Sequence, residues 1–287
     1  MDLSPRRQPP TVRLRRLAAE LRRLRAAASF TREQVSDQTA INSATLYRIE
    51  TAKVRPQRRT LMALLDMYGV KDETRRAEMI ALSQRSTEPG WLQSYDSELP
   101  EQYTTYISFE ADARSLRSYE SLFVPGLLQT EDYARAVIAG GLPMDDDEME
   151  RRVEARVRRQ AVLDKKKPLK LWAIVDEAAL RRQVGGPKVM AAQLQRLIAA
   201  ARKPHVTVQV VSYATGAHPG MHGSFAVMDF PDAADPDLVY IESLAGDLFL
   251  EREAEVRRYA SIFEQLRAAA MNPADSVRLL NDLAERI

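Results

Sequence analysis

The sequence predicts an α+β protein of two domains: an all-α domain of five helices, then an α+β domain whose small sheet is covered by helices. In the first part of the chain, apolar side chains recur at the three- and four-residue spacing of an amphipathic helix. In the second part, short runs of β-branched and aromatic residues alternate with helical segments. With 287 residues the chain is long enough for two domains. We place them at residues 1–84 and 106–287, with a linker at 85–105.

The charged residues are distributed unevenly. Residues 1–70 hold 14 Lys and Arg against 6 Asp and Glu, whereas the rest of the chain holds 28 against 34. A basic N-terminal part is typical of proteins that neutralise nucleic-acid phosphates. A generally arginine-rich composition is the alternative, but it does not explain why acidic residues are scarce at one end only.

The composition excludes several classes of protein and site. The chain has no cysteine, which excludes disulfides, thiolate metal sites and cysteine nucleophiles. It has no run of about 18 apolar residues for a membrane span, and its first residues lack the apolar segment of a secretory signal. We therefore expect a cytoplasmic protein with no membrane partner and no cofactor.

Helix boundaries in the N-terminal domain follow from apolar spacing and capping residues. Four leucines predict a first helix that ends near Ser29: Leu14, Leu17, Leu21 and Leu24. Thr31, with Gln34 three residues later, forms a capping-box pattern that begins a short second helix. Asn42 or Ser43 caps a third helix. Two further apolar stripes predict a fourth and a fifth helix: Leu61, Leu64, Leu65 and Tyr68, then Met79, Ile80 and Leu82.

The second and third helices have the layout of a DNA-reading helix-turn-helix. In that motif the N-terminal residues of the last helix contact base edges, while neighbouring segments contact phosphates. Small hydroxyl and methyl groups suit base edges. We therefore predict base contacts for the outward-facing residues of the third helix: Ser43, Ala44, Thr45 and Tyr47. We predict phosphate contacts for Asn42 at the start of this helix and for three residues in the loop after it: Lys53, Arg55 and Arg58. Arg32, at the N-terminus of the second helix, is placed to contact a phosphate or a flanking guanine.

Other residues of this segment have a structural interpretation. Arg48 and Glu50 are expected to form a pair that ties the third helix to the first, rather than to contact bases. For Ser43 and Thr45 the alternative is an ordinary surface role. Arg58, with Arg59, can equally form a solvated helix start.

Two strings of this segment fit a known pattern: Thr31-Arg32-Glu33-Gln34-Val35 and Thr45-Leu46-Tyr47-Arg48-Ile49-Glu50. They resemble the lambda-repressor-like, XRE-type helix-turn-helix regulators. That family commonly has Gln where Arg32 stands and Gly where Ala40 stands. The resemblance implies a DNA-binding transcription regulator with a slightly altered turn.

The C-terminal domain alternates between helical and strand-like segments. Helices are predicted at 107–119, 131–139, 149–164 and 187–201, and again at the end of the chain. Strands are predicted at 169–175, 206–211, 225–230 and 238–242. The apolar segment 124–130 is either a corner of the core or the rim of a partner groove.

Several strings carry a second resemblance: residues 124–130, 132–135, 176–181, 216–220 and 240–243. They are similar to the C-terminal domain of a large group of XRE-type regulators from high-GC bacteria. Such regulators are often encoded beside a small partner protein, in an arrangement likened to toxin–antitoxin pairs. The resemblance implies an antitoxin-like repressor whose C-terminal domain binds that small protein, and it supplies no catalytic residues.

We predict no catalytic and no metal site. Asp176 and Glu177 resemble an acid pair, but acidic residues also favour the first turn of a helix. His218 and His222 lie in a Pro/Gly-rich segment with no third ligand in sight. We therefore expect a regulator, not an enzyme.

The partner or ligand surface is predicted in the C-terminal domain, at these residues: Val124, Leu127, Tyr213, His218, Glu242 and Asp247. The leading function is a DNA-binding regulator that forms a homodimer, since two-fold symmetry doubles the site that is read. The alternative is a repressor with a small-molecule pocket in the C-terminal domain. An enzyme fused to a DNA-binding domain is less favoured, because no nucleophile–base pair is visible.

Overall fold

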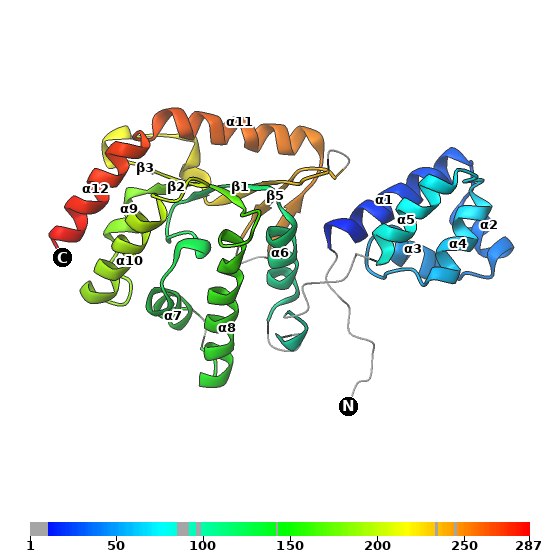
Figure 1. Ribbon diagram of the computed structural model, residues 1–287, viewed down its shortest axis with the longest axis horizontal. Coiled ribbons are helices and arrows are strands. Elements are labelled where there is room, and N and C mark those ends of the chain that lie inside the picture. Colours follow the sequence, from blue (N-terminus) through cyan, green and yellow to red (C-terminus); the bar gives the residue numbers. More distant parts are fainter. Residues whose placement is uncertain (1–10, 85–91, 96–98, 142, 233–234, 244–245) are drawn as a thin grey trace. The chain divides into compact units, whose positions relative to one another are not determined.

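The computed structural model describes residues 11–84, 92–95, 99–141, 143–232, 235–243 and 246–287 (Figure 1). The chain divides into two compact units. The first comprises Met1–Ser94 and Pro100–Phe109, and the second comprises Tyr95–Leu99 and Glu110–Ile287. We describe each unit by itself.

The first unit contains the five predicted helices, and their bounds follow the predicted stripes closely. They are α1 (Val12–Ala27), α2 (Arg32–Thr39), α3 (Ser43–Glu50), α4 (Arg58–Met67) and α5 (Glu73–Gln84). One core holds them together, formed by these buried residues: Leu17, Leu21, Leu24, Val35, Leu46, Ile49, Leu61, Leu64, Leu65, Tyr68, Val70 and Met79.

The predicted caps fix the two central helices. Thr31 Oγ1 accepts a hydrogen bond from the backbone N–H of Gln34, and the Thr31 N–H donates to Gln34 Oε1, which completes the capping box. Asn42, rather than Ser43, caps α3, because its Oδ1 accepts from the N–H of Ala44 at 2.8 Å. Ala40 connects the two helices with a φ of 56°, a left-handed conformation that glycine adopts more readily.

The second unit is built on a six-stranded sheet in the order β3-β2-β1-β4-β5-β6. Its strands are β1 (Ser115–Glu120), β2 (Lys170–Asp176), β3 (Val206–Val211), β4 (Phe225–Asp229), β5 (Leu238–Ile241) and β6 (Leu248–Leu250). β1, β2 and β3 are parallel, and β4, β5 and β6 each run antiparallel to the strand before them in the sheet. β5 therefore runs in the same direction as β1, and the two end at the same edge of the sheet.

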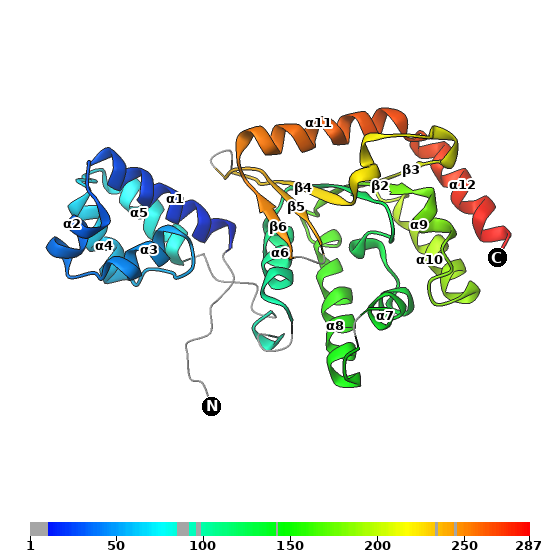
Figure 2. The same ribbon diagram turned by 180° about the vertical axis from the view of Figure 1, so that it is seen from behind.

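Helices cover both faces of this sheet. On one face α11 (Glu253–Ala269) packs against the strands through Phe263 and Leu266. Figures 1 and 2 show α7 (Glu131–Ala139), α8 (Asp146–Arg158) and α10 (Pro187–Ala200) on the opposite face. Two more helices complete the unit: α9 (Glu177–Arg181), which follows β2, and α12 (Pro273–Glu285), which contacts α10 and β3. The predicted α+β class is confirmed.

Two strands were not predicted. The sequence predicted a helix at 107–119 and four strands, but α6 spans Glu101–Asp112 and β1 begins at Ser115. β1 contains no β-branched residue, and two of its six residues are serines, so its sequence has little strand propensity. It is a strand because it pairs with β2 on one side and β4 on the other. β6 has three residues, which is too short for a periodic signal.

The predicted linker at 85–105 contains regular structure. Residues 92–95 form a 3-10 helix with Leu92 and Tyr95 buried, and α6 begins at Glu101. Within this predicted linker, residues 85–91 and 96–98 lie outside the described part of the chain.

Candidate DNA-binding site and sheet-edge site

The third helix presents a polar face to solvent and an apolar face to the core. Leu46 and Ile49 are buried at 0% and 2% exposure. Ala44, Thr45 and Tyr47 are exposed and Ser43 is partly exposed, at the N-terminal end of α3. These four are the predicted base-contacting residues, and the fold leaves them accessible to a groove of DNA.

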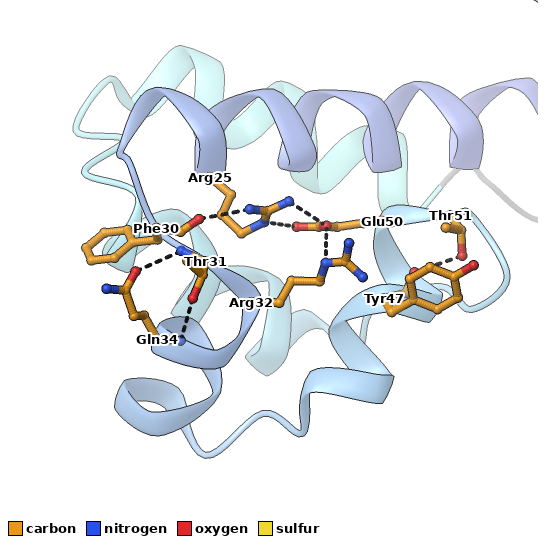
Figure 3. A network of polar contacts seen from close by, with 8 residues as sticks. All are labelled: Arg25, Phe30, Thr31, Arg32, Gln34, Tyr47, Glu50 and Thr51. Atoms are coloured by element: carbon orange, nitrogen blue, oxygen red, sulfur yellow. Dashed lines mark hydrogen bonds and ion pairs between the residues drawn. The ribbon is translucent and has the colours of Figure 1, made fainter.

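A buried carboxylate holds α3 against the first two helices (Figure 3). Glu50, 2% exposed, accepts hydrogen bonds from Arg25 Nε at 2.6 Å and Arg25 Nη2 at 3.1 Å. Arg25 also donates to the carbonyl oxygen of Phe30 at 2.8 Å. The prediction that Glu50 ties α3 to α1 is thus correct, but its partner is Arg25 and not Arg48, whose side chain is exposed.

Two cations lie close to the exposed Tyr47 ring. The Arg32 guanidinium is 5.2 Å from the centre of the Tyr47 ring, and Lys53 Nζ is 5.5 Å from it. Arg32 Nε also lies 3.6 Å from Glu50 Oε2. Arg32 is therefore held in place before any DNA arrives, and it lies at the first residue of α2, where the helix dipole favours anions.

The other predicted phosphate contacts surround this cluster. Asn42, Lys53 and Arg55 are exposed. Arg58 is exposed as well, and it is the first residue of α4, which agrees with the alternative of a helix start and not with a loop position. A helix start binds phosphate well, because its N–H groups and positive dipole end point outward.

The apolar loop at 124–130 is a corner of the core. Val124 and Leu127 are 1% and 2% exposed, so their assignment to a partner surface is wrong. Three buried glutamine side chains hydrogen-bond the backbone of this loop. The Gln129 amide donates to the Val124 carbonyl, and the Gln160 amide donates to the carbonyls of Gly126 and Gln129. The Gln193 amide donates to the Leu128 carbonyl and accepts from the Thr130 N–H. Buried backbone groups need such partners, and side chains supply them here.

The other four predicted surface residues lie at one edge of the sheet. β1, β2, β3 and β5 all end at this edge, which we call the carboxyl edge. Tyr213 and His218 follow β3, Glu242 follows β5, and Asp247 precedes β6. Asp247 accepts a 2.9 Å hydrogen bond from the Tyr240 hydroxyl.

Asp176 and Glu177 begin a helix, as the sequence predicted. Their side chains also contact residues of the segment that follows β3 at the carboxyl edge. Asp176 Oδ1 caps α9 by accepting from the Ala178 N–H at 2.9 Å. Its Oδ2 accepts from the Tyr119 hydroxyl at 3.2 Å and lies 3.4 Å from His218 Nε2. Glu177, 6% exposed, accepts from the Tyr213 N–H at 2.8 Å. No local sequence pattern linked Tyr119 with Asp176 and His218, because β1 was not predicted as a strand.

Glu120 ends β1 on the opposite face of the sheet from Tyr119. Burial raises the pKa of its carboxyl group from 4.5 to about 7, with Glu242 adding to the rise and Ser224, Arg159 and Arg156 opposing it. The carboxyl group therefore titrates near neutral pH.

Glu120 is expected to make the stability of the C-terminal unit depend on pH. Its pKa is higher in the folded chain, so its contribution is fully present below about pH 4.5 and is lost as the pH rises through about 7. At about 1.4 kcal/mol per pKa unit, the loss amounts to ~3 kcal/mol. In urea titrations from pH 4.5 to 8, Glu120→Gln should remove this dependence, whereas the exposed control Glu285→Gln should keep it. Equal profiles for the two variants would contradict the assignment.

Within the described residues, no group of three or more His, Asp and Glu side chains is placed to hold a metal ion. No helix among those residues is both long and apolar enough to cross a membrane.

Comparison with known protein families agrees with the two units. Residues 16–79 match a family described as a helix-turn-helix domain, which confirms the predicted motif. Residues 103–282 match a domain of unknown function, DUF5753. No curated protein and no solved structure matches the chain. The match over residues 103–282 covers more than half of the chain, which therefore belongs to the DUF5753 family and carries an XRE-like helix-turn-helix that makes it a DNA-binding regulator.

Proposed function

We propose that the protein is a cytoplasmic, homodimeric, antitoxin-like repressor that binds one operator sequence and is controlled through its C-terminal domain by a small protein. Two observations support recognition of a DNA sequence. The N-terminal part of α3 is exposed and has basic residues around it, and Glu50 holds the helix in position through its ion pairs with Arg25 and Arg32. A dimer would place two such helices in successive major grooves. A regulator of this kind acts by binding, and we assign it no catalytic residue.

Arg55 should contribute affinity without specificity. It is exposed in the segment between α3 and α4, where a contact to phosphate carries no sequence information. Arg55→Ala should weaken binding to operator and random DNA by a similar factor. It should also lower the slope of log K against log salt by about one per protomer. Anisotropy titrations at several salt concentrations measure both effects, with Arg22→Ala, an exposed arginine of α1, as the control. If Arg55→Ala weakened binding to the operator but not to random DNA, Arg55 would contact a base and not a phosphate.

The carboxyl edge supports the proposal of a protein partner. Large apolar side chains are exposed there: Leu122 and Phe123 after β1, Tyr213 and Met221 in the segment between β3 and β4, and Leu248 at the start of β6. Exposed apolar groups of this size mark interaction sites when they occur together. Glu242, which is exposed after β5 at the same edge, favours a partner with a basic rim around an apolar contact.

Native mass spectrometry of the protein purified from its own cells tests this partner. We expect an added mass of several kilodaltons, and we expect Leu122→Ser with Phe123→Ser to abolish it while DNA binding remains. Val157→Ser, at an exposed position of α8, is the matched control. A dimer that carries no more than a few hundred daltons would contradict the proposal and favour the alternative, a small-molecule sensor.

A further inference from the structure

A group of cations lies where two neighbouring parallel strands begin, at the edge of the sheet opposite the carboxyl edge. β2 begins at Lys170 and β3 at Val206, and the two strands pair with each other. The start of β2 and the segments before both strands carry six basic side chains, which we call the lysine surface: Lys165, Lys166, Lys167, Lys170, Arg202 and Lys203. Residues 110–287 as a whole are acidic, with 24 Lys and Arg against 27 Asp and Glu. The positive charge is therefore a local feature of this edge.

The fold holds the two segments of the lysine surface side by side. Lys203 Nζ donates to Asp164 Oδ1 at 2.6 Å, and the backbone N–H of Leu171 donates to the His205 carbonyl at 2.8 Å. Four of the six cations are exposed and, within the described residues, their side chains make no ion pair or hydrogen bond: Lys166, Lys167, Lys170 and Arg202. These four positive charges are compensated by solvent and counterions alone in this part of the chain.

The chemistry of the lysine surface fits phosphates better than it fits a protein. Lysine accounts for 8 of the 42 basic residues of the chain, and five of those 8 lie here. A lysine binds phosphate as a point charge, whereas paired recognition of protein carboxylates favours the planar fork of arginine. Protein interfaces also depend on apolar or aromatic anchors. None of the exposed large apolar side chains in the described part of the chain belongs to residues 164–170 or 202–205. A polyanion needs no such anchor, because the release of its counterions provides the affinity.

Acidic side chains limit the lysine surface on one side. Next along the same edge, Arg114 before β1 is paired with Asp229 at 2.6 Å. The segment between β4 and β5 then carries Asp232 and Asp237. The effect of an exposed charge is largely screened beyond about 8 Å at physiological salt. A polyanion is therefore expected over the β2–β3 side of this edge and not over the β4–β5 side.

We propose that the lysine surface is a second DNA contact, which binds backbone phosphates of the DNA molecule that the helix-turn-helix binds. Double-stranded DNA is the polyanion that the helix-turn-helix brings to this chain. Once one site is bound, the other meets the same molecule at a high effective concentration, so individually weak phosphate contacts add affinity. Such contacts carry no sequence information. The inference rests on DNA binding by the helix-turn-helix, and not on the small protein partner or on recognition of one operator.

Anisotropy titrations of the full-length protein with duplex DNA at several salt concentrations test the proposal. A variant that combines Lys166→Gln, Lys167→Gln and Lys170→Gln removes three of the unpaired charges and keeps side chains of similar length. We expect the slope of log K against log salt to fall by about two to three per protomer, on operator and random DNA alike. At about 0.1 M salt the affinity should fall at least about tenfold.

Two further variants separate a local contact from a general effect of charge. Arg182→Gln with Lys188→Gln and Arg258→Gln removes three exposed cations from other parts of the same unit, and should leave the slope unchanged. Replacing the three lysines by arginine should keep the slope of the unmodified protein, because a phosphate contact requires a positive charge.

Three outcomes would overturn the proposal. The first is an unchanged slope in the glutamine variant of the lysine surface, and the second is an equal fall in the control variant. The third is a change of oligomeric state in the glutamine variant, measured by sedimentation velocity, since the surface would then join two copies of the chain. If the unmodified protein bound no duplex at all, the DNA-binding assignment itself would fail, and the second contact with it.

Discussion

Glu50→Ala is expected to destabilise the helix-turn-helix domain by ~3–5 kcal/mol, which is a large part of the stability of a domain this small. Glu50 is 2% exposed, and the Arg25 side chain that it binds is 15% exposed. Removing the carboxylate leaves the Arg25 guanidinium largely buried, and among the described residues the Phe30 carbonyl is its remaining hydrogen-bond acceptor. It also removes the ion pair that holds Arg32.

Urea titration of the full-length protein, read by hydrogen exchange of peptides from residues 12–84, measures this loss for the first unit alone. Glu33→Ala, at an exposed position of α2, should change stability by less than about 0.5 kcal/mol. The double variant Arg25→Met with Glu50→Leu should recover much of the loss, because an apolar pair can replace a buried ion pair. A loss below about 1 kcal/mol for Glu50→Ala would show that the pair contributes little to this domain.

The second large effect is expected on operator recognition. Thr45→Ala with Tyr47→Ala removes two exposed polar side chains from the outward face of α3. A good base contact contributes about 1–3 kcal/mol of discrimination, so the double variant should lose at least about tenfold in affinity for the operator. Affinity for random DNA should fall by much less, since phosphate contacts dominate there.

The measurement requires an operator selected from random duplexes with the unmodified protein, followed by anisotropy titrations at one salt concentration. Thr74→Ala, an exposed threonine at the start of α5, is the matched control and should bind both DNAs normally. Tyr47→Phe removes the hydroxyl and keeps the ring, which contacts Arg32 and Lys53. It therefore distinguishes the contribution of the hydroxyl from that of the ring. Equal losses on operator and random DNA would exclude Thr45 and Tyr47 from base reading.

Most of the N-terminal domain was predictable from its sequence. The capping box at Thr31, the cap at Asn42 and the apolar stripes are local patterns within a few residues of one another, and such patterns act on the backbone directly. The exposed positions on α3 follow from the same helical spacing, because Leu46 and Ile49 mark its buried face. The partner of Glu50 was not predictable, because Arg25 is 25 residues away and only the packing of α1 on α3 brings the two together.

In the C-terminal domain the sequence by itself determined the α+β class and four of the strands. Only the tertiary structure decided that Ser115–Glu120 is a central strand, since its pairing partners are far along the chain. That strand brings Tyr119 to Asp176 and His218. The same packing buried Val124 and Leu127, which looked available to a partner. Burial and long-range pairing depend on residues distant in sequence, so no local pattern encodes them.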